Sequence, residues 1–243
     1  MVIVTFKLIF FFKFDLMFLI TNFSIPQGLS IRDPLQSELG KSILTNSVIL
    51  MDEIGFESFT FKKLAEKMGS NETSIYRYFE NKHFILLYIV VWYWNWVSYL
   101  IDYNSKNISD PNLKLDLIID NFVNATKENP SVEFINEKVL HRVMISESSK
   151  SYHTKNIDEE NKQGFYSSYK ALIQKVADVI LEIDPKFPYP HSFANNLFEM
   201  ANKEIFFAEH LPRLTDVKIK NEDYSQIINL LKYYKCKMLN VTS

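Results

Sequence analysis

The sequence predicts an all-α fold, in which an N-terminal three-helix unit precedes a longer helical bundle. Apolar residues recur at helical spacing in successive segments, and the prolines after residue 32 fall between these segments rather than inside them. No stretch of useful length alternates apolar and polar residues as a half-buried strand would. Only 5 of the 243 residues are glycine, which argues against a sandwich or barrel that needs many tight turns.

The composition limits the kinds of site that the chain can carry. The formal net charge is −2, with 27 basic and 29 acidic residues, so a contact with nucleic acid must come from a local basic patch. The single cysteine, Cys236, excludes an internal disulfide framework and a cysteine-ligated zinc site. No histidine pair has i, i+4 spacing, and Gly-rich phosphate loops and the G-x-S-x-G elbow are absent. We therefore expect no metal site, no cofactor and no enzymatic activity.

The first 32 residues are interpreted as an apolar extension and a linker. Sixteen of residues 1–20 are apolar, and Thr5, Lys7, Lys13 and Asp15 interrupt them. The apolar residues favour membrane insertion by about 6 kcal/mol and the three charges oppose it by about 9 kcal/mol, which makes a spanning helix doubtful. No small-residue cleavage site follows, as a signal peptide would require. The extension either lies outside the functional protein, packs on its body or anchors it to a membrane.

Capping signals divide the first part of the chain into helices. Asp33 and Pro34 have the pattern of an N-cap followed by proline at the first helical position, and Gly55 supplies a C-terminal cap. Thr60 and Gly69 delimit a second helix in the same way. These signals predict four helices, at about 34–53, between 60 and 69, at 72–79 and at 82–103.

Proline positions divide the second part of the chain. Asp110 and Pro111 repeat the signal of a cap followed by proline, and the apolar period after them continues until Pro130. A proline-rich stretch at 185–190 and Pro212 mark two later breaks. The apolar periodicity between these breaks predicts further helices at about 111–129, 131–145, 157–183, 191–210 and 222–239.

The second and third helices, joined by a turn at Gly69, have the pattern of a helix-turn-helix over about 60–79. Ile75 and Phe79 lie four residues apart and are expected to anchor the third helix from below. The side chains that then turn outward, free to read a major groove, are Glu72, Thr73, Tyr76 and Arg77. Residues 60–82 hold five basic and three acidic residues, an excess that would equally suit a solvated helix face.

The segment GFESFTFKKLAEKMGSNETSIYRYFENK, residues 55–82, resembles the TetR/AcrR family of bacterial transcriptional regulators. The matching positions are Gly55, Phe59, Thr60, Leu64, Ala65, Gly69, Ser74, Ile75, Tyr76, Phe79, Asn81 and Lys82. The resemblance covers about 36–96, roughly a quarter of the chain. It implies a helix-turn-helix DNA-binding domain over 33–96 and an all-helical effector-binding and dimerisation domain over 97–243.

The family resemblance also implies a function, a cytoplasmic ligand-responsive repressor that binds a palindromic operator in double-stranded DNA as a homodimer. Carried over by position, the residues that hold phosphates would be Thr60, Ser74, Tyr76 and Lys82. Those that face bases or adjacent backbone would be Lys62, Asn71, Glu72, Thr73 and Arg77. Thr73 stands where many members have Gly or Pro, and Asn46 and Ser47 replace common alanines, which leaves the details of base reading open.

The fourth helix carries an aromatic face for which two interpretations stand. Trp92, Trp96, Tyr99 and Tyr103 follow one another at 4, 3, 4 spacing, so they share one side of the helix. They would line the pocket of a small-molecule effector or simply form an aromatic core. Likewise, helices 191–210 and 222–239 would form a homodimer interface or be buried within one chain. An alternative function is a helical membrane-associated interaction module that uses the apolar N-terminus and this aromatic helix, with the three-helix unit structural only.

Overall fold

The computed structural model describes residues 23–125 and 135–241, and the regular structure of these residues is helical apart from one isolated bridge between Lys220 and Asp223. The predicted all-α fold, with a helix-turn-helix followed by a helical bundle, is confirmed. The interpretation of residues 1–20 as an apolar extension falls outside the described residues. Residues 23–92 and 135–165 form one compact unit, the first unit, and residues 93–125 and 166–241 form the second unit.

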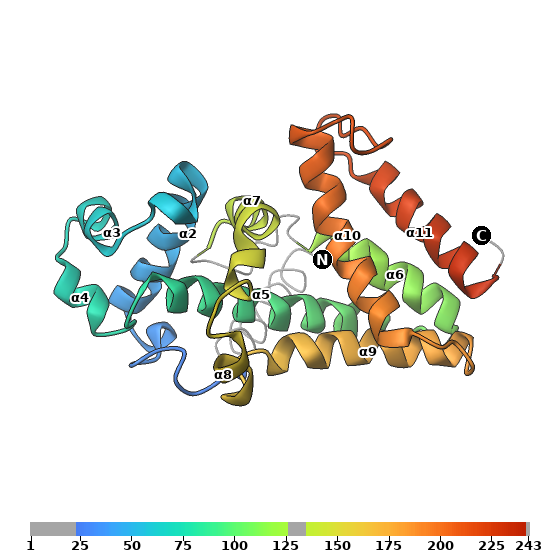
Figure 1. Ribbon diagram of the computed structural model, residues 1–243, viewed down its shortest axis with the longest axis horizontal. Coiled ribbons are helices and arrows are strands. Elements are labelled where there is room, and N and C mark those ends of the chain that lie inside the picture. The colour runs from blue at the N-terminus through green and yellow to red at the C-terminus, as the bar shows by residue number, and fades with distance from the viewer. Residues whose placement is uncertain (1–22, 126–134, 242–243) are drawn as a thin grey trace, which may run out of the picture. The chain divides into compact units, whose positions relative to one another are not determined.

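The first unit contains the helix-turn-helix. Its elements are η1 (Pro34–Gln36), α2 (Glu38–Ser58), α3 (Phe61–Met68), α4 (Glu72–Tyr76), the first part of α5 (Lys82–Ser105), α7 (Glu137–Glu147), η2 (Ser148–Ser151) and α8 (Ile157–Lys162). Helix α2 packs against η1, α3 and α7, and α3 in turn packs against α4 (Figure 1). Helix α2 is therefore the scaffold on which the helix-turn-helix and α7 are both mounted.

The start of α2 differs from the sequence prediction. Asp33 caps, and Pro34 begins, only the short 3₁₀ turn η1, whereas α2 itself starts four residues later. Its N-cap is Ser37, whose Oγ accepts a hydrogen bond of 3.0 Å from the Gly40 amide. Gly40 is buried against η1, and a side chain there would collide with the Pro34 backbone. The chain can therefore bend sharply at Ser37, because Ser37 caps α2 and Gly40 has no side chain to collide with η1.

The other capping signals of the first unit hold in the structure. Gly55 has φ 72°, so it interrupts the regular helix where its left-handed geometry favours glycine, and one further turn follows to Ser58. The Thr60 side chain accepts a hydrogen bond from the Lys63 amide at 3.2 Å. Gly69, with φ 61°, closes α3 in the left-handed conformation. The turn between the two helices of the motif is therefore where the sequence places it.

The second unit is a bundle of the remaining helices. It contains the rest of α5 together with α6 (Pro111–Asn124), α9 (Ser167–Ile183), α10 (Pro190–His210) and α11 (Ser225–Leu239). Helix α9 packs against α6 and α10, and α11 packs against α6 and α10. The apolar stripes of α10 and α11 are largely used in this packing, since Leu197, Ile205, Ile227 and Leu231 are buried.

Three predicted helix boundaries are wrong. The single helix predicted over 157–183 is two helices, α8 and α9, because Gly164 takes φ 82° and breaks the path between them. Helix α7 begins at Glu137 rather than at 131, and residues 126–134 lie outside the described part. Helix α4 ends at Tyr76 instead of continuing to 79, because a turn follows before α5.

Among the described residues, only α5 is long and apolar enough to cross a membrane by length and composition. Its most apolar window is, however, 72% buried inside the protein. Trp92, Tyr93 and Trp96 each expose at most a few per cent of their surface. This burial is typical of the central helix of a packed bundle, and the apolar character of α5 is accounted for by the core that it forms.

Candidate DNA-binding surface

The third helix of the motif, α4, is held in place by its apolar side. Ile75 and Phe79 are completely buried, as is Leu64 on the neighbouring α3. The Phe79 ring meets the Tyr88 ring edge-on, with 5.6 Å between the ring centroids. A helix of five residues is not stable alone, so this packing is what forms it. Ile75 and Phe79 therefore act as the anchors that their spacing predicts.

The outward side of α4 faces solvent. Glu72, Thr73, Tyr76 and Arg77 are all exposed. Tyr76 keeps 50% of its surface accessible although its ring packs edge-on against the Phe61 ring at 4.8 Å. Arg77 directly follows the helix and has no ion-pair or hydrogen-bond partner in the described part of the chain. This face is therefore accessible to a partner molecule.

Two of the residues expected to contact DNA already serve as helix caps. The Asn71 side chain accepts hydrogen bonds from the Ser74 amide at 3.0 Å and from the Ser74 hydroxyl at 3.1 Å. Thr60 uses one oxygen lone pair as the N-cap of α3, which leaves its hydroxyl hydrogen free to donate to a phosphate. The Ser74 hydroxyl must rotate away from Asn71 before it can donate a hydrogen bond to a phosphate.

The lysines around the motif are less free than the sequence suggests. Lys63 donates to the Ser58 carbonyl at 2.9 Å, and Lys67 on α3 contacts both carboxylate oxygens of Glu53 on α2 at 2.9 Å. Lys62, in contrast, is exposed and has no partner among the residues that the structure describes. Lys62 and Arg77 are therefore the basic side chains of the motif that an anion can bind without displacing a partner.

Lys82 lies at the start of α5 and joins it to the end of α2. Its ammonium donates to the carbonyl oxygens of Phe56 and Glu57 at 2.9 and 3.0 Å, and it lies 4.7 Å from the centroid of the Phe56 ring. These contacts give a further partner to carbonyls in the last turn of α2, where the helix itself supplies few donors. A phosphate that engages Lys82 must share its ammonium with this cap or draw it away.

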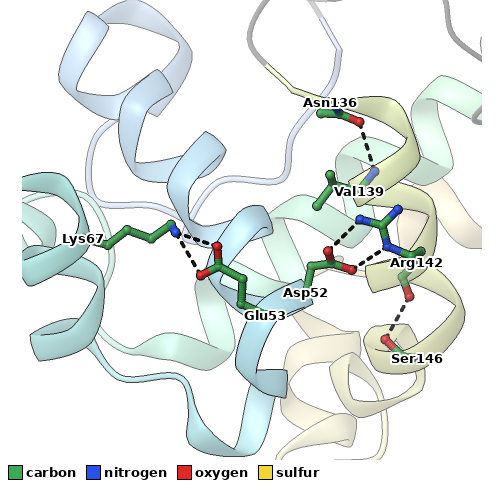
Figure 2. Close-up of polar contacts among 7 residues, drawn as sticks. All are labelled: Asp52, Glu53, Lys67, Asn136, Val139, Arg142 and Ser146. Carbon is green, nitrogen blue, oxygen red and sulfur yellow. Dashed lines mark hydrogen bonds and ion pairs between the residues drawn. The ribbon is translucent and has the colours of Figure 1, made fainter.

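Adjacent carboxylates on α2 fasten two other helices, as Figure 2 shows. Glu53 holds Lys67 of α3, while Asp52 forms a bidentate pair with Arg142 of α7, with distances of 2.8 Å to Nε and 2.7 Å to Nη2. The Asn136 side chain caps α7 by accepting from the Val139 amide at 3.2 Å. Sequence reasoning missed the Asp52–Arg142 pair, because nothing local connects residues 90 positions apart.

The four aromatic residues proposed for an effector pocket have different surroundings in the structure. Trp96, Tyr99 and Tyr103 stack in a row within the second unit, with 5.7 and 6.0 Å between successive ring centroids. Trp96 is buried and donates its indole N–H to the Ala125 carbonyl at 2.9 Å, whereas Tyr103 is 49% exposed. Trp92 instead packs edge-on against Phe23 in the first unit at 5.8 Å.

The histidines and carboxylates of residues 23–125 and 135–241 show no grouping of three that could hold a metal ion. His83 makes a contact of 2.9 Å through Nε2 to Glu160, a buried residue of α8 in the same unit. This pair joins α8 to the first turn of α5 and has the character of a structural contact.

The geometry of the first unit defines a helix-turn-helix DNA-binding domain of a transcriptional regulator. Residues 43–89 match the family model described as "Bacterial regulatory proteins, tetR family". The chain thus carries the DNA-binding domain of that family, and its resemblance to TetR/AcrR regulators is confirmed. No curated protein matches the sequence.

Solved structures of similar fold cover most of the chain. A fatty acid degradation regulator, FadR from Bacillus halodurans, is 14% identical, with a TM-score of 0.59 over 84% of this chain and 95% of its own. AibR in complex with isovaleryl coenzyme A and operator DNA is 11% identical, with a TM-score of 0.56 over 81% of this chain and 97% of its own. Apo AibR gives 12% identity, a TM-score of 0.53 and coverage of 80% and 98%. At these identities the likeness concerns the fold.

Proposed function

We propose that this chain is a ligand-responsive transcriptional repressor that binds a palindromic operator as a homodimer and is released by a small-molecule effector. The observation that carries the proposal is that α4 is buried on one side and exposed on the other. Ile75 and Phe79 fix it from below, while Tyr76 and Arg77 are exposed on the opposite side. A recognition helix needs this combination, because it must be rigid and must still present its side chains to the major groove.

The reading surface combines base contacts with phosphate contacts. Arg77 suits bidentate binding to guanine, and Glu72 suits acceptance from the amino group of cytosine. Further contacts to bases or the adjacent backbone are assigned to Lys62, Asn71 and Thr73. Phosphate contacts are assigned to Thr60, Ser74, Tyr76 and Lys82. All of these residues except the half-buried Ser74 and Lys82 are exposed, and their exposure and the hydroxyl hydrogen of Thr60 support this division of roles.

The homodimer is supported by the apolar surface that the second unit leaves exposed. Tyr233, Tyr234 and Met238 project from α11 into solvent, whereas Ile227 and Leu231 of the same helix are buried in the unit. A homodimer joined through this face of α11 would carry two copies of the recognition helix, one for each half-site of a palindromic operator. Sedimentation at micromolar concentration tests the dimer, and a purely monomeric chain contradicts it.

The effector is supported by polar groups enclosed in the second unit. The Tyr93 hydroxyl and the Asn202 side-chain oxygen are buried without a hydrogen-bond partner among the described residues. Burial raises the pKa of Tyr93, so its hydroxyl remains a neutral donor. Such groups favour a bound water or a ligand that pairs with them. Because AibR was solved with isovaleryl coenzyme A, short acyl-coenzyme A thioesters are the first class of effector to test.

The operator is obtained by selecting duplexes from a random library with the wild-type protein. Arg77→Ala should then bind the selected operator about 10- to 100-fold more weakly and lose preference at the base pair that it reads. Arg213→Ala is the matched control, since Arg213 is also exposed but lies in the loop between α10 and α11. The proposal fails if the wild-type protein selects no sequence, or if the Arg77 and Arg213 variants bind the operator equally well.

Release is tested on the same complex. Isovaleryl coenzyme A, added at rising concentration, should free the operator from the wild-type protein and change the fluorescence of Trp96, which begins the aromatic row of the second unit. Tyr93→Phe should need a higher concentration, because it removes the buried hydroxyl while retaining the ring. Coenzyme A without an acyl group serves as the control ligand.

A further inference from the structure

The segment before α2 is fastened to the end of the recognition helix. The Ile31 amide donates a hydrogen bond of 2.8 Å to the carbonyl of Tyr78, which lies two residues beyond the end of α4. The Tyr78 hydroxyl lies 2.7 Å from Oγ of Ser37, the residue that caps α2. Leu29 is completely buried and anchors the segment from the other side. Residues 29–37 thus have a fixed position beside α4.

Arg32 follows directly after this backbone contact, and its side chain is exposed. It has neither an ion pair nor a hydrogen bond in the described part of the chain. Neighbouring Asp33 forms no ion pair with it, and the Asp33 carboxylate instead accepts hydrogen bonds from the Leu35 amide at 2.9 Å and from the Tyr88 hydroxyl at 3.5 Å. An unpaired guanidinium therefore lies in the segment that is fixed beside α4.

Arg32 and Arg77 are linked through a single hydrogen bond. Arg77 precedes Tyr78, and Arg32 follows Ile31, so the Cα atoms of the two arginines are at most about 15 Å apart by standard bond lengths. The major groove is about 12 Å wide, so this limit is of the same order as the distance from a groove-reading arginine to the sugar–phosphate edges that border the groove. The other two arginines of the chain are placed differently, since Arg142 is paired with Asp52 and Arg213 belongs to the second unit.

We propose that Arg32 is a further DNA-contacting residue, which binds the duplex beside the half-site that α4 reads. The proposal rests on the DNA-binding function proposed above. Its ligand is the anionic edge formed by the phosphate backbone and the adjoining minor groove, and a guanidinium suits both parts of this edge. Homeodomains use arginines of the arm before their first helix in a comparable way. Arg77 reads bases inside the half-site, whereas Arg32 contacts the DNA that flanks it.

The test uses the full chain and the operator selected by the wild-type protein. Arg32→Ala should lower operator affinity about 10-fold and reduce the slope of log affinity against log salt by about one. It should also remove hydroxyl-radical protection of the flank while leaving base preference inside the half-site unchanged. Arg32→Lys, which keeps the charge, should restore the salt slope. Arg213→Ala should match the wild-type protein in each measurement.

The outcomes separate this inference from the proposed function. If the wild-type protein selects an operator and Arg32→Ala binds it with wild-type affinity, slope and footprint, the role of Arg32 is refuted while the function stands. If the wild-type protein selects no DNA, the function itself fails. Exchange of flanking A·T pairs for G·C assigns the contact within the edge. If the G·C exchange lowers the operator affinity of the wild-type protein but not that of Arg32→Ala, the guanidinium lies in the minor groove. If the wild-type protein binds both operators with equal affinity, the guanidinium lies on phosphate. Both results support the contact.

Discussion

Replacing Gly40 by alanine tests how the segment before α2 is held in position. A Cβ atom there would lie 2.5 Å from Cα and 2.7 Å from the carbonyl carbon of Pro34, and closer still to the Pro34 oxygen. Overpacking costs about 1–3 kcal/mol, and the upper end applies because the obstacle is backbone, which cannot rotate away. Alanine inside a helix regains about 1 kcal/mol relative to glycine. We therefore expect a net loss of about 2 kcal/mol of stability.

The assay is urea unfolding followed by far-ultraviolet circular dichroism. Gly69→Ala is the control, because Gly69 has φ 61° and no neighbouring atom within 4 Å of the added carbon, so only the strain of the left-handed backbone, about 1 kcal/mol, is felt. Displacement of η1 should also shift Arg32, so Gly40→Ala should lower operator affinity in addition to stability. A Gly40→Ala protein that is as stable as the wild type would refute the close contact between η1 and α2.

Three further predictions concern charged groups of the first unit. In a double-mutant cycle on urea unfolding, Asp52→Asn and Arg142→Gln should show a coupling of about 1 kcal/mol, and purely additive effects would contradict the bidentate pair. Burial, with the nearby Arg142 charge, lowers the pKa of His141 to about 4. Stability should therefore fall as the pH drops from 6.5 towards 4, by on the order of 3 kcal/mol, and His141→Phe should flatten this slope. Lys82→Met keeps the carbon stem over Phe56 and should weaken binding to operator and random DNA by the same factor.

Most helices could be predicted because their signals are local. Thr60 and Gly69 cap α3 through contacts within a few residues, and these residue types prefer those positions intrinsically. The break between α8 and α9 could not be predicted in the same way. The apolar period continues across it, and a single glycine such as Gly164 is tolerated inside many helices. Only its φ of 82° in the folded chain shows that the path turns there.

The anchoring of the recognition helix could also be predicted, and the environment of its lysines could not. Ile75 and Phe79 are both buried, as their spacing predicts, because the turn after α4 keeps the Phe79 amide hydrogen-bonded to the Ile75 carbonyl. The partners of Lys82 are carbonyls in the last turn of α2, more than 20 residues earlier. Arg32 offered no signal either, because its place beside α4 depends on the long-range bond from Ile31 to Tyr78.

The pairing of these lysines has a consequence for how the domain discriminates among DNA sequences. Three of the five basic residues between 60 and 82, namely Lys63, Lys67 and Lys82, already have oxygen partners within the protein. Salt-dependent, sequence-independent affinity grows with the number of phosphates neutralised. With a net charge of −2 and only a small local excess of basic residues around the motif, the chain should bind random DNA weakly and with a shallow salt slope. Operator affinity then depends largely on Arg77 and on the fit of α4 in the groove. A steep slope on random DNA would instead mean that Lys63, Lys67 and Lys82 leave their partners when the duplex arrives.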